Sequence, residues 1–116
     1  MQSTLFIIND APYGNERAYN ALRLAGVLAG RGDLQVRIFL MADAVGCAKA
    51  GQKVPEGYYN IQLMLAKVLR KGEVALCGTC MDARGLTDAD IAEGARRSTL
   101  NELAQWTADA DKVLVF

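Results

Sequence analysis

Short apolar, β-prone runs alternate along the whole chain with segments whose apolar residues recur at helical spacing. The runs are residues 4–8, 34–40, 73–77 and 112–116, and the helical segments are residues 15–29, residues 58–71 and a stretch that opens at Thr99. This alternation predicts an α/β domain with a mainly parallel sheet and helices on both faces. In such a sheet the loops that follow the strands gather at one edge, where chemistry is usually placed.

Length and charge limit the classes of function. The 116 residues suit a single domain, predicted over residues 1–116, and a hydrophobic content of 52% is ample for a core. Thirteen basic and thirteen acidic side chains cancel, so we expect neither nucleic acid nor a membrane as a direct partner. The first apolar run stops at Asn9 and Asp10, unlike a signal peptide, and no stretch approaches the ~20 apolar residues of a membrane span. We therefore predict a cytoplasmic protein.

Two cysteines three positions apart, Cys77 and Cys80, follow the third predicted strand on a predicted loop. A sulfur close to a helix start is stabilised as thiolate by free N–H groups and by the helix dipole. Arg84 adds to this stabilisation, and Asp82 opposes it. Cys77 continues the strand, whereas Cys80 lies beyond Gly78, where the chain turns. We predict that Cys80 is the reactive thiol and that Cys77 is secondary.

The three cysteines also allow other interpretations. Small buried cysteines are common in cores, and packing is the prediction for Cys47, which has alanine neighbours at helical spacing. A thioredoxin-like dithiol is disfavoured, because such chains carry the pair early and a proline after it, while Pro12 and Pro55 both precede it here. Structural zinc requires four ligands, and this chain has three cysteines and no histidine. We expect no metal and no cofactor, and the lack of histidine excludes catalysis by a Cys-His pair or a Ser-His-Asp triad.

Small and polar residues follow the first two predicted strands. Ordinary turn chemistry explains each of them taken singly. In a parallel sheet, however, they would share an edge with Cys80, and with Gly78 and Asp82 they form the predicted binding set. They are Asn9, Asp10, Tyr13, Gly14, Met41 and Asp43.

Three local predictions concern the less regular segments. Asp43 is expected to cap a short helix that carries Cys47. The capping pattern at residues 87–90 is expected to start a helix that continues through residues 91–92. Residues 94–97 are compatible with a short edge strand or with a loop, and Arg96 and Arg97 are interpreted as a solvated pair.

Several blocks of sequence together carry a resemblance to a known family. They are residues 11–14, 39–44, 51–53, 57–62, 103–107 and 110–114, and above all the block Cys-x-Thr-Cys-x-Asp-x-Arg-Gly at residues 77–85. On these blocks the chain resembles the DsrE/DsrF-like family almost from end to end. The resemblance implies a three-layer α/β/α fold with a mostly parallel five-stranded sheet. It also implies a symmetric homo-oligomer, a hexamer in preference to a trimer. Aromatic residues are enriched at such interfaces, so the candidate interface anchors are Tyr13, Tyr58, Tyr59 and Trp106.

The resemblance further implies sulfur relay, in which one cysteine carries sulfane sulfur as a persulfide. The leading hypothesis is a sulfur carrier or sulfurtransferase in which Cys80 takes the sulfur from a donor protein and passes it to an acceptor protein. Cys77 would resolve or share the sulfur, and Arg84 would support the thiolate. The alternatives are a dithiol oxidoreductase that uses a Cys77–Cys80 pair and a non-catalytic oligomeric protein that binds a ligand.

Overall fold

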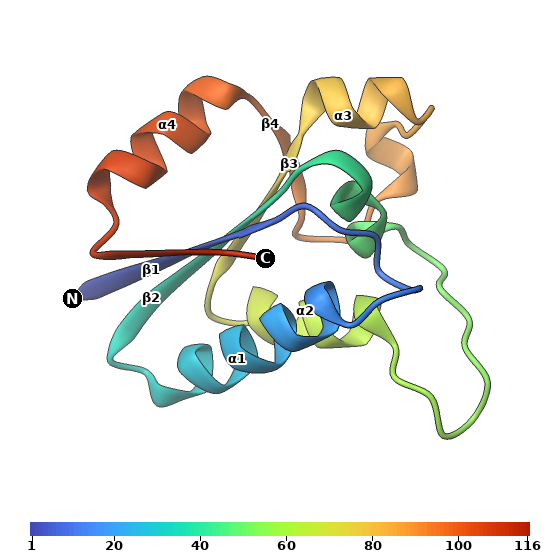
Figure 1. Cartoon of the computed structure of the whole chain (residues 1–116), viewed down its shortest axis with the longest axis horizontal. Coiled ribbons are helices and arrows are strands. Elements are labelled where there is room, and N and C mark those ends of the chain that lie inside the picture. Colours follow the sequence, from blue (N-terminus) through green and yellow to red (C-terminus); the bar gives the residue numbers. More distant parts are fainter.

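The computed structural model describes residues 1–116 and contains one five-stranded sheet with helices on both faces (Figure 1). The strands are β1 (Gln2–Ile8), β2 (Leu34–Leu40), β3 (Glu73–Cys77), β4 (Arg96–Ser98) and β5 (Lys112–Val115). The helices are α1 (Arg17–Arg31), α2 (Ile61–Leu69), α3 (Gly78–Ala83), α4 (Leu100–Asp109) and the 3-10 helices η1 (Ala42–Ala48) and η2 (Asp88–Asp90). The strand order is β4-β3-β2-β1-β5, and every adjacent pair is parallel. α1 and α2 cover one face and α4 covers the other, which confirms the predicted three-layer α/β/α fold.

Local sequence signals set the ends of the helices. α1 stops at Gly32, which adopts the left-handed conformation that closes a helix without steric cost. At the start of α2 the Asn60 side chain accepts the Leu63 N–H at 3.1 Å. Thr99 accepts the Glu102 N–H at 3.3 Å at the start of α4. Each cap satisfies an amide that the helix itself leaves unpaired.

The side chains of alternate strand residues pack into two hydrophobic cores, one on each face of the sheet. The larger core packs strand residues such as Phe6 and Ile38 against α1 and α2. In the smaller core, Leu5 and Phe39 pack against Trp106 of α4, whose indole is only 5% exposed. Burying one such large side chain stabilises the fold by about 1.5–3 kcal/mol. Trp106 is therefore a core residue, and its prediction as an interface anchor is wrong.

The strand register brings the predicted loops to one edge of the sheet. Ile8 pairs with Leu40, and Leu40 pairs with Leu76, so the first three strands end at one level. Cys77, the last residue of β3, lies opposite Ser98 of β4. The prediction that these strand ends share an edge is confirmed.

Two local predictions are wrong, and one open question is resolved. Asp43 does not cap η1, because no side chain bonds the first amides of that helix. The capping box of Thr87 and Asp90 is present, but η2 ends at Asp90, and Ile91 instead forms an isolated antiparallel bridge with Lys49. Residues 94–97, which are compatible with a strand or a loop, overlap β4, and that strand extends from Arg96 to Ser98. None of the helices combines the length and the apolar character needed to cross a bilayer.

Candidate functional site

The two neighbouring thiols lie where β3 passes directly into α3. α3 begins at Gly78, so Cys80 lies in the first helical turn and not on a loop as predicted. Cys77 occupies the position just before the helix, and its Sγ accepts the backbone N–H of Cys80 at 3.3 Å. The cysteine takes the place of the usual hydroxyl or carboxylate cap. This capping geometry keeps the Cys77 sulfur beside Cys80.

Cys77 is the thiol whose charged form the site favours. Partial desolvation raises its pKa, but hydrogen bonds to the sulfur from the side chains of Cys80 and Thr79 and from their backbone amides outweigh it. The Thr79 Oγ1 lies 3.3 Å from the Cys77 Sγ. The pKa of Cys77 therefore lies below its ordinary value, because donors aimed at a sulfur stabilise the thiolate.

Cys80 shifts in the opposite direction. Desolvation raises its pKa, and its hydrogen bond to Cys77 and the charge of the Cys77 thiolate raise it further. A backbone hydrogen bond from Ala42 and the charge of Arg84 lower the pKa but do not compensate. The electrostatic argument for Cys80 considered Arg84 and omitted the competition between the two sulfurs, which favours the thiolate on Cys77.

A strained residue faces the pair from the neighbouring strand end. Ala42 is the only non-glycine residue with a positive φ, at 51°. Such a conformation costs on the order of 1–3 kcal/mol and persists where the surrounding structure imposes it. Here it orients the Ala42 backbone toward the Cys80 sulfur. The end of β2 thus contributes to the thiol site through its main chain.

Arg97 of β4 lies over the start of α3 and was missed in the sequence. Its Nη1 and Nη2 atoms bind the two carboxylate oxygens of Asp82, each at 2.8 Å. A Cβ on Gly78 would lie 2.9 Å from the Arg97 Nε and 3.0 Å from the Ser98 carbonyl oxygen, so only glycine lets β4 approach so closely. The Cys77 thiolate is among the charges that raise the pKa of Arg97, after Asp82. The arginine that was interpreted as solvated is thus the cation next to Cys77.

Arg84, the predicted cation of the site, has a different main partner. Its Nε and Nη2 donate to Asp43 Oδ1 at 3.0 and 2.9 Å, and its Nη1 donates to the Cys80 carbonyl oxygen at 3.0 Å. It therefore ties η1 to α3 and acts on the Cys80 sulfur only weakly. The predicted residues Asp43 and Arg84 are nevertheless brought together beside the thiols.

The thiols open into a cavity of about 470 Å³ between β3, α3 and the start of α4. Among the predicted residues, Met41 and Gly78 join both cysteines in its wall. The unpredicted lining consists of Thr79 and of four residues at the β4–α4 junction, Arg97, Ser98, Thr99 and Leu100. Leu100 is 68% exposed, so one wall is apolar and open. Knowing that β4 pairs with β3 would have indicated these residues, but a three-residue strand carries too weak a pattern to reveal this.

The predicted residues after β1 lie apart from the thiol cavity. The Asn9 backbone N–H bonds the Phe116 carbonyl oxygen at 2.9 Å, and Asp10 pairs with Arg17 at 2.9 Å. The Tyr13 hydroxyl donates to Gln52 at 2.5 Å and accepts the Ile61 N–H at 3.1 Å. Tyr13 lines a separate cavity of about 400 Å³ with Lys53, Val54, Pro55, Tyr58 and Tyr59, while Gly14 forms a left-handed turn with a φ of 107°. These four residues share the sheet edge with the thiols but form no part of the cavity wall.

The third cysteine has the packing role that was predicted. Cys47 is fully buried in the larger core, and burial raises the pKa of its thiol to about 12. No three cysteine or carboxylate side chains converge in a way that could hold a metal ion.

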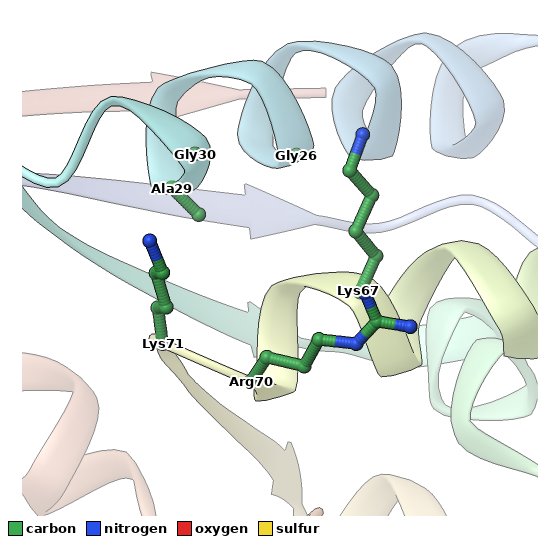
Figure 2. Close-up of a pocket in the computed structure, with 6 residues that line it drawn as sticks. All are labelled: Gly26, Ala29, Gly30, Lys67, Arg70 and Lys71. Carbon is green, nitrogen blue, oxygen red and sulfur yellow. The ribbon is translucent and has the colours of Figure 1, made fainter.

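A smaller hollow of about 120 Å³ lies between α1 and α2 (Figure 2). Lys67 and Lys71 extend from the α2 segment toward α1, while Arg70 lies along α2. Gly26 and Gly30 form the α1 side, and none of the three cations makes an ion pair. Both helices end here, and cations near helix C-termini are stabilised by the partial negative charge. We call this region, lined by Gly26, Ala29, Gly30, Lys67, Arg70 and Lys71, the basic groove.

Comparison with known proteins assigns the chain to a family. A sequence model of the DsrE/DsrF-like family matches residues 2–116. The chain belongs to the DsrE/DsrF-like family. The YchN protein of Escherichia coli K12 is 48% identical over 118 residues, with all of both chains covered. An uncharacterised protein of the archaeon Methanopyrus kandleri is 39% identical over 110 residues, which cover 95% of this chain and 90% of that protein.

Solved structures agree with this DsrE/DsrF-like assignment. The crystal structure of E. coli YchN superposes with a TM-score of 0.95 at 47% identity over the full length of both chains. A protein of unknown function from Methanobacterium thermoautotrophicum superposes with a TM-score of 0.81 over both full lengths. At 10% identity, that second similarity shows the shared fold alone.

Proposed function

We propose that this protein carries sulfane sulfur as a cysteine persulfide and passes it from a donor persulfide to an acceptor thiol. The observation that carries the proposal is the Cys77 sulfur, which accepts the Cys80 amide at the start of α3 and faces an open cavity, with hydrogen bonds that lower its pKa from the ordinary value. The DsrE/DsrF-like family is associated with sulfur relay, which supports this chemistry for a chain with a reactive thiol and no histidine.

The transfer proceeds in two exchange reactions. The Cys77 thiolate attacks the terminal sulfur of a donor R–S–SH, the S–S bond of the donor breaks, and RS⁻ leaves. Cys77 then holds the sulfur as a persulfide. An acceptor thiolate attacks the outer sulfur and regenerates the Cys77 thiolate. Thiolate character and access govern such exchanges, and Cys77 combines both at the cavity wall.

This proposal moves the sulfur from Cys80, the residue that the sequence favoured, to Cys77. Two sulfurs in contact cannot both hold a negative charge at low cost, and the amide of Cys80 is directed at Cys77. Cys80 is then the neighbouring protonated thiol. Arg84 remains a supporting residue through its bonds to Asp43 and to the Cys80 carbonyl.

The test is intact-mass analysis after exposure to glutathione persulfide, followed by removal of the small thiol. We expect Cys80→Ser to gain one sulfur atom and Cys77→Ser to gain none. Cys47→Ser is the matched control, because the buried Cys47 thiol is outside the cavity and should leave loading unchanged. Loading of Cys77→Ser but not of Cys80→Ser would return the role to Cys80. If no variant gains sulfur, relay fails, and a ligand-binding protein becomes the better proposal.

The proposal places the protein in the cytoplasm, where free thiols remain reduced, and it requires donor and acceptor proteins. We also propose a homo-oligomer, a hexamer or a trimer. Tyr58 is 71% exposed, Leu100 is 68% exposed and Val115 is 65% exposed, and these side chains supply apolar surface for an interface. Light scattering at micromolar concentration tests this proposal, and a monomer would refute it.

A further inference from the structure

We propose that Cys80 discharges the persulfide on Cys77, forming a Cys77–Cys80 disulfide and releasing hydrosulfide. The inference rests on the proposed function, since it starts from a sulfur-loaded Cys77. It adds persulfide reduction to sulfur transfer, and it gives the second thiol of the pair its own role.

The position of the Cys77 sulfur determines which persulfide atom Cys80 can attack. The Cys77 Sγ is the atom held 3.3 Å from the Cys80 amide, and the two side chains line the same cavity wall. In the persulfide this Sγ becomes the inner sulfur, and the outer sulfur extends beyond it. An attack on the outer sulfur would move it to Cys80, whereas an attack on the inner sulfur forms a disulfide. The capping geometry therefore favours the inner sulfur.

The discharge step needs no further reactant. Proton transfer from the Cys80 thiol to the outer sulfur gives Cys77–S–SH and the Cys80 thiolate, which react to form Cys77–S–S–Cys80 and HS⁻. A bond forms between the two Sγ atoms, and the bond from the Cys77 Sγ to the outer sulfur breaks. The Cys80 sulfur is oxidised, the outer sulfur is reduced to sulfide, and the Cys80 proton leaves with it. A thiol reductant then resets the disulfide by ordinary exchange.

The two thiols also differ in pKa, as loading on Cys77 followed by attack from Cys80 requires. Desolvation and the hydrogen bond to Cys77 keep the pKa of Cys80 above its ordinary value. Cys77 is therefore the thiol that attacks the donor, while Cys80 retains the proton that the departing sulfide takes. The two cysteines stand three positions apart across the first turn of α3 and line the same cavity wall. Their proximity makes the second step intramolecular, which favours it strongly over attack by a dilute external thiol.

The experiment follows the lifetime of the persulfide. Reduced wild type, Cys80→Ser, Cys80→Ala and Cys47→Ser are loaded anaerobically with glutathione persulfide and desalted. Intact mass and released hydrosulfide are then measured over time without added thiol. We expect both Cys80 variants to keep the sulfur at least about tenfold longer than wild type and Cys47→Ser, as intramolecular attack predicts. Wild type should release one equivalent of hydrosulfide and end two hydrogen atoms lighter than the reduced protein, with Cys77 and Cys80 in one disulfide-linked peptide.

The outcomes separate the two proposals. Loading at the first time point of the Cys80 variants reports on sulfur relay, and the lifetime reports on discharge. A wild type that keeps its sulfur as long as the Cys80 variants would overturn the discharge and leave the relay intact. So would transfer of the sulfur onto Cys80 without hydrosulfide release. If the Cys80 variants never gain sulfur, relay through Cys77 fails, and the discharge fails with it. An unloaded anaerobic wild type should remain reduced, which excludes stray oxidation as the source of the disulfide.

Discussion

The thiol cavity and the basic groove both collect arginine or lysine side chains, but they hold them in different ways. In the cavity, Arg97 is fixed by two bonds to Asp82 and lies beside a low-pKa thiol. In the groove, Lys67 and Lys71 have no carboxylate partner and face two helix C-termini. Charge in the groove therefore supports the helices, whereas charge in the cavity is held in place by a partner and acts on a nucleophile. A cluster of like charges therefore indicates a chemical site only when a reactive group, such as a thiol, lies beside it.

The strongest test of this difference removes the reactive atom. Cys77→Ser should abolish the fast phase of alkylation by iodoacetamide at neutral pH, because only the Cys77 pKa is lowered. Lys67→Gln in the basic groove should leave that phase unchanged. Alkylation is followed by mass spectrometry over time. If Cys77→Ser retained the fast phase, the thiolate would lie on Cys80 and the electrostatics described above would be reversed.

Two buried glycines give opposite expectations in the two regions. Gly78→Ala should destabilise the protein by about 1–3 kcal/mol, because the new Cβ meets Arg97 and the Ser98 backbone at 2.9–3.0 Å. Gly26→Ala in the basic groove meets only the flexible Lys67 side chain, at 3.6 Å. It should stabilise α1 by about 0.5–1 kcal/mol, since alanine is the better helix former. Urea unfolding measures both changes. If Gly78→Ala stabilised the protein and Gly26→Ala destabilised it, β4 would not lie tightly on α3.

Removing the fixed cation should have a smaller effect on reactivity. Arg97 favours the Cys77 thiolate, so Arg97→Gln should raise the Cys77 pKa and move the pH dependence of alkylation upward. Arg97 is exposed and shared with Asp82, so the effect should be small and should shrink further with added salt. Adding Asp82→Asn should recover part of the loss by removing the unpaired carboxylate. Arg84→Ala should change mainly the reactivity of Cys80, and by less than Arg97→Gln changes that of Cys77. If the pH dependence of alkylation in Arg97→Gln were identical to that of wild type, Arg97 would be excluded from the site.

The smallest effects belong to the basic groove. Lys67→Gln and Arg70→Gln should each destabilise the protein by about 0.3–1 kcal/mol at low ionic strength, since each removes a cation from the end of α2. Added salt should reduce the difference from wild type. Persulfide loading should be unaffected in both variants. A loss of loading in either would show that the groove and the cavity are coupled.

Much of the fold was predictable, because its signals are local. Strand ends, the glycine that stops α1 and the cap at Thr99 depend on residues within one turn or one strand of one another. The same locality explains why Met41, Asp43, Gly78, Asp82 and Arg84 were correctly expected near the thiols. They directly follow buried parallel strands, whose carboxyl ends must share an edge.

The residues after β1 show where this reasoning stops. A shared edge is wider than one site, and Asn9, Asp10, Tyr13 and Gly14 take other partners along it. Sequence order cannot show which of two neighbouring loops lies next to a given strand end. The three residues of β4 also carry no periodicity that could have shown Arg97 to be part of the site.

The sequence by itself determined that a pair of cysteines stands at the end of a buried parallel strand in a chain without histidine. The tertiary structure decided which sulfur holds the charge. That choice depends mainly on the hydrogen bonds that the Cys77 sulfur receives from Thr79 and Cys80 once the chain has turned into α3. Folding also brings the Ala42 backbone to Cys80 and the Arg97 guanidinium to Cys77 from two other segments. Electrostatic and hydrogen-bond energies fall off steeply with distance and angle. Spacing along the chain could therefore locate the two thiols, but only their arrangement in space could rank them.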